Sequence, residues 1–138
     1  MAKHIIVSNR LPIKISKVNN SFKFIPTSGG LATGMNSIHK NNNSLWIGWP
    51  GISHDEIDSL SIDKMNKKLY ASGFYPVHLS SKDIKDFYYG LPNNCLWPLF
   101  HYFIEYSLFD NLQWEKYKEI NKKFSDCVLS NLEKDDTV

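Results

Sequence analysis

Short apolar runs recur along this chain, and each is followed by a stretch whose pattern favours a helix. Residues 5–7 (IIV), 45–49 (LWIGW) and 74–79 (FYPVHL) carry β-branched and aromatic side chains in runs of strand length. Helical spacing of apolar residues follows in residues 31–38 and again after residue 80. Alternation of strands with helices favours an α/β fold with a mainly parallel sheet and flanking helices.

The longest regular element is predicted near the end of the chain, in residues 112–133. Its apolar residues recur at three- and four-residue steps on one face of a helix that packs against the sheet. They are Trp114, Tyr117, Phe124, Val128 and Leu132, with Ile120 and Cys127 beside them. Thr137 and Val138 read as the first residues of another strand. We therefore expect the α/β pattern to continue beyond Val138, so that the 138 residues form a truncated domain.

Other segments carry weaker signals. Residues 14–25 are largely polar and predict a loose surface hairpin, and residues 62–69 predict a short helix. Ser80 and Asp83 have the spacing of a capping box and predict the start of a helix. Residues 96–102 (LWPLFHY) are apolar and aromatic, and we expect a short buried helix there.

The composition is that of one folded, soluble domain. Hydrophobic residues make up 42% of the chain and aromatic residues 14%, which is too many for a disordered protein. The net charge of +2 is dispersed, whereas a nucleic-acid surface needs a directional excess of positive charge. No run approaches the ~20 apolar residues of a membrane span, and the strand pattern begins too early for a secretory signal. We expect a cytoplasmic protein without membrane or nucleic-acid partners.

Cysteine and histidine placement gives no sign of a metal site. Cys95 and Cys127 lie far apart among apolar residues, which favours reduced, buried thiols over a disulfide framework. None of the five histidines has a cysteine, aspartate or glutamate at metal-ligand spacing. His101, in an aromatic segment, is interpreted as a core residue. The sequence thus predicts no metal and no evident acid–base group.

Two features could bind a phosphate. Arg10 directly follows the first predicted strand, at the carboxyl edge where open α/β sheets bind ligands, and its guanidinium suits a phosphate or carboxylate. A surface ion pair is an equally good interpretation from position alone. Gly29 and Gly30 lie at a turn that opens a helix, where a ligand can approach the backbone and the helix dipole favours an anion. Most such turns, however, have no ligand.

Aromatic side chains near strand ends could bind a sugar. Trp49 precedes a Pro-Gly turn and Tyr88 precedes Gly90, so both are candidates for a cleft. Trp46 and Trp97 are flanked by apolar residues, which favours a place in the core at least as strongly.

Four strings, in order, make these features more specific. Residues 7–13 (VSNRLPI), 28–32 (SGGLA), 45–51 (LWIGWPG) and 96–102 (LWPLFHY), with the helix that carries Trp114 and Phe124, resemble the trehalose-6-phosphate synthase family. The matches are collinear from about residue 5 to residue 128.

The resemblance implies a Rossmann-like amino-terminal domain of a two-domain, B-type glycosyltransferase, of which residues 1–138 are a part. It implies transfer of glucose from UDP-glucose to glucose 6-phosphate with retention of configuration, without a cofactor or an obligatory metal. The position of Arg10 would bind the acceptor's phosphate. Tyr88 and Trp97 would line the acceptor-sugar pocket, and Trp49 would border it.

The resemblance places the donor elsewhere. Gly29 and Gly30 would approach the diphosphate of UDP-glucose, while the carboxy-terminal domain that holds the nucleotide is absent. The catalytic groups are expected beyond Val138, so the 138 residues alone would be inactive.

The chain departs from the family pattern near the acceptor contacts. The family usually has Asn at the position of Tyr89, and a slip of one residue would exchange Tyr88 and Tyr89 as the acceptor contact. One alternative is a non-catalytic subunit that senses sugar phosphates or scaffolds a synthase complex, and a homo-oligomer is also open. A generic Rossmann-like nucleotide module is disfavoured because Gly-x-Gly-x-x-Gly does not follow the first strand.

Overall fold

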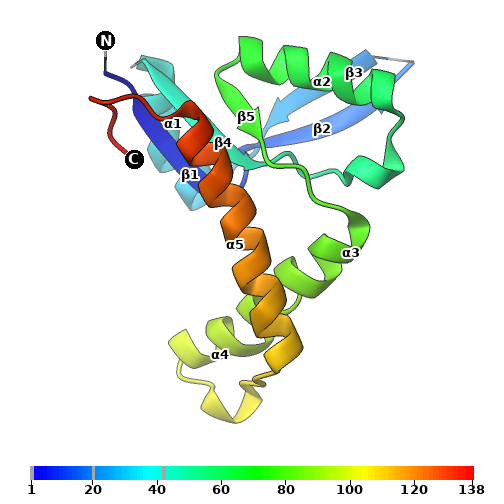
Figure 1. Cartoon of the computed structure of the whole chain (residues 1–138), viewed down its shortest axis with the longest axis vertical. Coiled ribbons are helices and arrows are strands. Elements are labelled where there is room, and N and C mark those ends of the chain that lie inside the picture. Colours follow the sequence, from blue (N-terminus) through cyan, green and yellow to red (C-terminus); the bar gives the residue numbers. More distant parts are fainter. Residues whose placement is uncertain (1, 20, 42) are drawn as a thin grey trace.

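A three-stranded parallel sheet forms the centre of the computed structural model, which describes residues 2–19, 21–41 and 43–138. Strands β1 (His4–Arg10), β4 (Ser44–Trp49) and β5 (Phe74–Pro76) lie in the order β1-β4-β5 (Figure 1). The predicted parallel α/β sheet is confirmed. The third strand is shorter than the expected residues 74–79: its last hydrogen bond to β4 runs from the Val77 N–H to Gly48 O at 2.9 Å.

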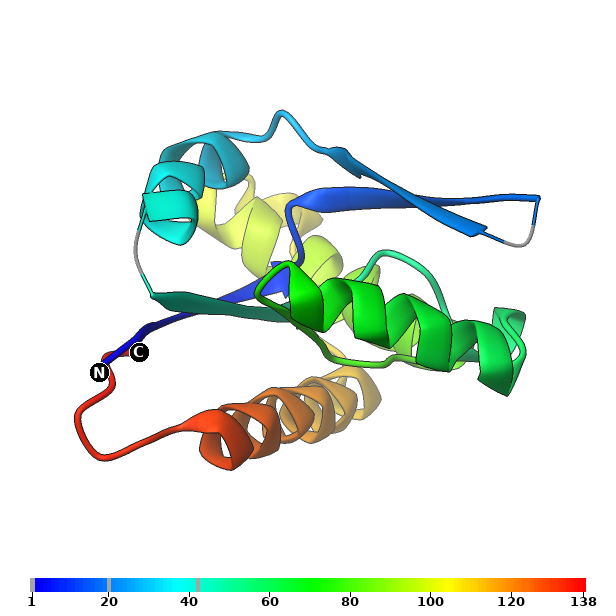
Figure 2. The ribbon, with the colours of Figure 1, turned by 90° about the horizontal axis from the view of Figure 1, so that it is seen from above.

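Helices cover both faces of this sheet. Neighbouring residues of a strand point to opposite faces. Ile5 and Ile47 accordingly pack against Ile120 and Phe124 of helix α5 (Asn111–Asn131). Figure 2 shows α5 on one side of the sheet and helix α1 (Gly30–Asn41) on the other. The predicted packing of the long helix against the sheet is confirmed.

The opposite face is covered by α2 (Ser59–Ala71) and by a separate hairpin. Strands β2 (Ile13–Val18) and β3 (Ser21–Pro26) pair antiparallel over their whole length, so the hairpin is regular rather than loose. The hairpin is regular because one of its sides is apolar and can be buried against the sheet. This second core contains Ile6, Leu11, Ile13, Phe22, Trp46, Met65, Leu69 and Phe74.

A series of short helical turns connects β5 to α5. The predicted capping box is present: Ser80 Oγ accepts from the Asp83 N–H at 3.0 Å and Asp83 accepts from the Ser80 N–H at 3.2 Å. Helix α3 (Ser81–Asp83) continues into the π-helical turn η2 (Ile84–Tyr88). Gly90 follows two residues after this turn, and a Cβ there would lie 1.9 Å from the carbonyl oxygen of Asp86.

The prediction of a buried helix in residues 96–102 is wrong. After the π-helical turn η3 (Pro92–Leu96), helix α4 (Trp97–Phe100) is a single turn at the end of the molecule away from the sheet (Figure 1). Pro98 is buried, but Trp97 is 54% exposed and Tyr102 is 91% exposed. One turn of helix can bury only one side, so the others project outward.

An exposed apolar segment follows from this, spanning residues 99–112 and including the 3-10 turn η4 (Ile104–Tyr106). Its exposed side chains are Leu99, Phe100, Tyr102, Phe103, Ile104, Tyr106, Leu108, Phe109 and Leu112.

Both cysteines are free thiols. Cys95 is buried as expected, and Cys127 is half-buried.

The end of the chain lies beside β1. The Ile5 N–H donates to Thr137 O at 2.7 Å and the Thr137 N–H donates to Lys3 O at 3.1 Å, as a parallel strand would. The predicted strand start at Thr137 is therefore a bridge to the outer edge of β1. Within the described ranges, no helix is long and apolar enough to span a bilayer.

Candidate functional site

Arg10 lies where the carboxyl ends of two neighbouring strands meet. In the parallel register Arg10 is opposite Trp49, and its guanidinium carbon lies 5.5 Å from the centroid of the Trp49 ring. The guanidinium also lies against Gly51, where a Cβ would come within 2.8 Å of Arg10 Nη2. Gly51 has φ +84°, a left-handed conformation that favours glycine. Sequence reasoning used Pro50-Gly51 only as a turn and missed its second role, which is to leave room for the arginine.

Trp49 connects Arg10 to Tyr88. Its indole is 7% exposed and donates from Nε1 to Ile52 O at 3.1 Å, so the ring is fixed. The Tyr88 ring packs against it with centroids 5.9 Å apart. The strand ends therefore bring Arg10, Trp49 and Tyr88 into one row. Because Trp49 is nearly buried, it supports the other two side chains more than it offers a surface of its own.

Ser8 ties this row to the core. Its hydroxyl accepts from Trp46 Nε1 at 2.8 Å and donates to the carbonyl oxygen of Arg10 at 2.7 Å. The pairing of β1 with β4 is irregular between Val7 and Arg10, and this hydrogen bond holds the irregular stretch. Trp46 is 1% exposed, which agrees with the core position that its apolar neighbours favour.

Arg10 and Gly29 line the same cavity, of about 160 Å³, at the first turn of α1. The first N–H groups of a helix have no partner within the helix and carry a partial positive charge. Neither Gly29 nor Gly30 is at a positive φ, and a Cβ on either would meet no atom of the described residues within 4 Å apart from its chain and helix neighbours. The fold itself therefore does not require glycine at these positions, and the space in front of them is open.

The structure separates Tyr88 from Tyr89. Tyr88 is half-buried against Trp49, whereas Tyr89 is 61% exposed and lines a larger cleft of about 880 Å³ between η2 and α5. The two rings meet edge to face, with centroids 5.1 Å apart. Of the two candidates for the acceptor contact, Tyr88 is the one on the side of Arg10.

Trp97 is not joined to this row. It lies on α4, stacked on the His101 ring with centroids 4.1 Å apart, and it is outside the lining of the cavity that Arg10 and Gly29 share. His101 is exposed, and its Nδ1 lies 2.7 Å from Trp97 O, so its expected place in the core is wrong. The cause is that α4 is a single turn, which can bury only one of its sides.

A second cavity, of about 290 Å³, lies on the α5 side of the same strand end. Ser8 and Asn9 line it together with Leu96 and Asn121. Asn121 donates from Nδ2 to Tyr117 O at 2.7 Å, which directs its amide oxygen outward from the helix backbone. Asn9 was not singled out in the sequence, although it lies next to Arg10 in the same string.

Charge at the site comes from Arg10 and the helix terminus rather than from acidic groups. Among the described residues, no three histidine, cysteine or acidic side chains are placed to hold a metal ion. The Asp83 carboxyl, whose pKa, despite burial, is held below its ordinary value by hydrogen bonds from Lys123, Ser80 and Lys116, lies on α3, before the turn that ends at Tyr88. The cavity that Arg10 shares with the first turn of α1 is therefore suited to bind an anionic group such as a phosphate.

Comparison with known proteins gives this arrangement a family. The sequence model of glycosyltransferase family 20 matches residues 2–138. The chain belongs to this family. Among its relatives, the UDP-forming alpha,alpha-trehalose-phosphate synthase of Botryotinia fuckeliana is 34% identical over 135 residues, covering 97% of this chain and 25% of the relative. The bifunctional trehalose-6-phosphate synthase/phosphatase of Thermoproteus tenax is 35% identical, covering 91% of this chain and 18% of the relative.

Solved structures of family-20 proteins share the fold. The alpha,alpha-trehalose 6-phosphate synthase from Burkholderia multivorans has a TM-score of 0.69 and 25% identity, covering 99% of this chain and 27% of that one. An E. coli trehalose-6-phosphate structure with bound UDP-2-fluoro glucose also has a TM-score of 0.69, at 26% identity, covering 98% of this chain and 26% of that one. The chain thus spans about a fifth to a quarter of the length of these relatives, and the expected Rossmann-like α/β fold is confirmed.

Proposed function

We propose that this chain supplies the acceptor-binding part of a family-20 glycosyltransferase that transfers glucose from UDP-glucose to glucose 6-phosphate. Residues 1–138 would be part of the amino-terminal domain of a two-domain, B-type enzyme, with the nucleotide-binding domain elsewhere. The observation that supports this best is the position of Arg10. It lines one cavity with the start of α1 and lies in one row with Trp49 and Tyr88.

The chemistry of this edge fits a phosphate attached to a sugar. A guanidinium offers two parallel N–H donors to a phosphate, and the N–H groups of the first turn of α1 add a partial positive charge. The cavity of about 160 Å³ is smaller than the about 300–1,000 Å³ of sites that enclose a whole ligand, so these residues by themselves enclose part of a substrate. It can hold the phosphate group, while Tyr88 offers a ring face and a hydroxyl to the sugar.

Gly29 and Gly30 would then face the second substrate. The open space in front of both residues lets a diphosphate approach the backbone without a clash. In the transfer, the bond between C1 of the donor glucose and the diphosphate breaks, a hydroxyl of the acceptor bonds to the same carbon, and UDP leaves with the electron pair of the broken bond while the hydroxyl proton is released. The contribution of this chain is to hold the acceptor in position, which lowers the entropic part of the barrier.

Isothermal titration calorimetry tests the proposal. The chain should bind glucose 6-phosphate weakly and show no turnover by itself, and Arg10→Ala should remove most of the binding. Lys14→Ala is the matched control, because Lys14 is an exposed cation on β2 that lies outside the cavity lining. Absence of heat with the unmodified chain, or equal binding by Arg10→Ala, would refute the proposal.

The exposed apolar segment favours a second candidate, a non-catalytic subunit that senses sugar phosphates or scaffolds a synthase complex. Apolar side chains such as Phe100 (71% exposed) and Leu112 (79% exposed) are typical of surfaces that contact another protein. Co-purification with an active synthase, without any binding of glucose 6-phosphate, would favour the scaffolding form of this candidate. Association of the chain with itself in place of the synthase would instead indicate a homo-oligomer through the same segment.

A further inference from the structure

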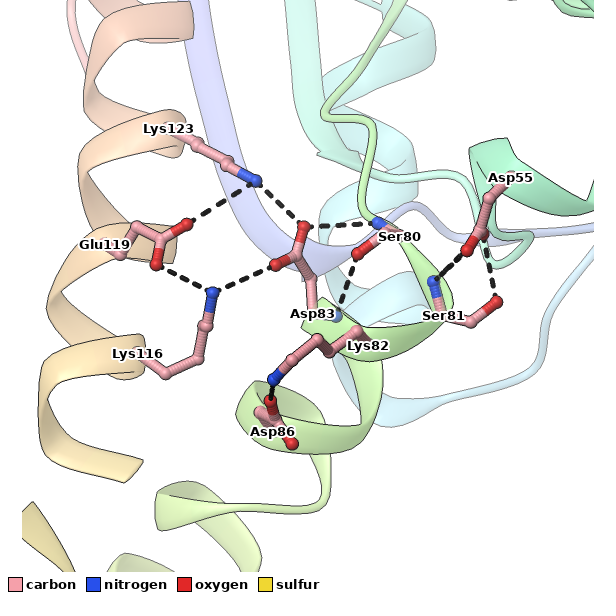
Figure 3. Close-up of polar contacts among 9 residues, drawn as sticks. All are labelled: Asp55, Ser80, Ser81, Lys82, Asp83, Asp86, Lys116, Glu119 and Lys123. Carbon is pink, nitrogen blue, oxygen red and sulfur yellow. Dashed lines mark hydrogen bonds and ion pairs between the residues drawn. The ribbon is translucent and has the colours of Figure 1, made fainter. Parts of the chain in front are cut away.

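A buried carboxylate joins the turn that carries Tyr88 to the long helix α5. Asp83 is 7% exposed, and its two oxygens face two lysines of α5: Lys123 Nζ donates at 2.8 Å and Lys116 Nζ at 3.3 Å (Figure 3). The N–H of Ser80 donates to the same carboxylate at 3.2 Å, within the capping box. Three donors from two separate elements therefore meet at one side chain.

Asp83 is charged in the folded protein. Burial by itself would raise its pKa, but hydrogen bonds from Lys123, from the backbone of Ser80 and from Lys116 outweigh this, and the pKa lies well below its ordinary value. Glu119 shares the lysines, accepting from Lys116 at 2.7 Å and lying 4.0 Å from Lys123. Two carboxylates thus alternate with two ammonium groups, and the arrangement is close to neutral.

Such an arrangement contributes orientation more than stability. The desolvation of a buried ion pair offsets most of its Coulombic attraction, so its net contribution to folding is small. Its geometry is nevertheless demanding, because a charged group left without its partner is costly. On the other side of the same turn, Asp55 accepts from the Ser81 N–H at 3.0 Å and from its hydroxyl at 3.0 Å. Helix α3 is therefore held from both sides (Figure 3).

Helix α3 leads directly to the row formed by Arg10, Trp49 and Tyr88. Asp83 is the residue before η2, which ends at Tyr88. Phe87, 5% exposed, stacks on Tyr117 of α5 with centroids 5.7 Å apart, while the next residue, Tyr88, packs on Trp49. A rotation of this single turn would move Tyr88 away from Trp49. The contacts that prevent the rotation are those of Asp83 and Phe87 with α5.

From this geometry we infer that Asp83 is a positioning residue for acceptor binding: its ion pairs with Lys116 and Lys123 hold Tyr88 against Trp49. The inference rests on the proposed function, since it assigns the positioned tyrosine to the acceptor sugar. Asp83 itself does not contact the substrate. Its effect therefore falls on the sugar and leaves the phosphate site at Arg10 and α1 unchanged.

Asp83→Asn removes the charge and keeps the size and an acceptor oxygen. Asp86→Asn is the matched control, because Asp86 lies one turn later and, among the residues that the structure describes, pairs only with the largely exposed Lys82. In Asp83→Asn the dissociation constant for glucose 6-phosphate should rise about fivefold, as expected for the loss of one hydrogen bond. Binding of inorganic phosphate should be unchanged in both variants.

The indole N–H resonance of Trp49 gives a readout that needs no ligand. Tyr88 packs on this ring, so the ¹⁵N-¹H resonance should shift in Asp83→Asn and stay in place in Asp86→Asn. If Asp83 served only stability, folded Asp83→Asn would show an unshifted resonance and unchanged binding of both ligands. That result would overturn the inference, and so would equal weakening of both ligands.

Two further arms keep the test decisive. If Asp83→Asn does not fold, Lys123→Met removes one ion pair while keeping the packing of the stem, and the same expectations hold. If the unmodified chain binds neither ligand, the proposed function fails, and the Trp49 resonance alone decides the positioning: a shift supports it and no shift overturns it.

Discussion

Replacement of Ser8 by alanine should weaken the fold at the point where the core meets the site. The Ser8 hydroxyl, 8% exposed, is the acceptor for Trp46 Nε1 at 2.8 Å and the donor to Arg10 O at 2.7 Å. The Trp46 ring is 1% exposed, so water has little access to its N–H once the hydroxyl is gone. The substitution therefore leaves a buried donor without a partner.

The magnitude follows from the two hydrogen bonds. An orphaned buried donor costs about 1–3 kcal/mol, whereas the Arg10 carbonyl, at the exposed end of β1, can bond water instead and costs about 0.5 kcal/mol. Ser8→Ala should thus lower the free energy of unfolding by about 1.5–3.5 kcal/mol. In a Trp46→Phe background there is no indole N–H, so the same substitution should cost only about 0.5 kcal/mol.

Urea unfolding of the four proteins, followed by circular dichroism, measures this double-mutant cycle. The urea midpoint should fall by about 1–2 M for Ser8→Ala in the native background. An equal loss in both backgrounds would show that the Ser8 hydroxyl is not the acceptor of the Trp46 N–H. The reasoning about how β1 is held would then be wrong.

Three further outcomes are expected. Gly30→Ala should leave the free energy of unfolding unchanged or raise it by up to about 1 kcal/mol, and should weaken phosphate binding in calorimetry. Gly90→Ala, whose Cβ would lie 1.9 Å from a carbonyl oxygen, should lower the free energy of unfolding by about 3 kcal/mol or more, and equal effects of the two substitutions would contradict this. Burial lowers the pKa of His39 and His78 below the ordinary 6.5, so near this pH the unfolded chain binds more protons than the folded chain. The free energy of unfolding measured in urea should therefore fall as the pH is lowered from about 7.5 to about 5.5, and a constant or rising value would contradict this. The exposed apolar segment should cause self-association in sedimentation at high concentration, and a clean monomer would show that its exposure is tolerated.

Local patterns predicted the elements well where one face of each is buried. The apolar stripe of α5 was readable because Ile120 and Phe124 recur at helical spacing and both pack on the sheet. The capping box at Ser80 was readable because its hydrogen bonds join residues three apart. Trp97 was misplaced because an apolar string does not reveal whether anything packs on it, and a single turn at the end of the molecule leaves it 54% exposed.

The candidate site was predicted in part. The family strings singled out Arg10, Trp49 and Tyr88, and the structure brings these three together through strand pairing and one ring contact. The place of Gly29 before a helix predicted that a ligand could approach it. The sequence did not show that the fold leaves no other atoms of the described residues near this position. Gly51 was visible only as a turn, since its contact with the guanidinium depends on how β1 lies beside β4.

The sequence by itself determined the alternation of strands and helices, the face of the long helix that packs on the sheet, and the family. These properties depend on periodicity and short-range hydrogen bonds, which are local in the chain. Only the tertiary structure decided that Asp83 is buried between lysines 33 and 40 residues away, and that the turn after it faces Trp49. Contacts of that separation form when whole elements pack, and no local pattern records which side chains will then meet.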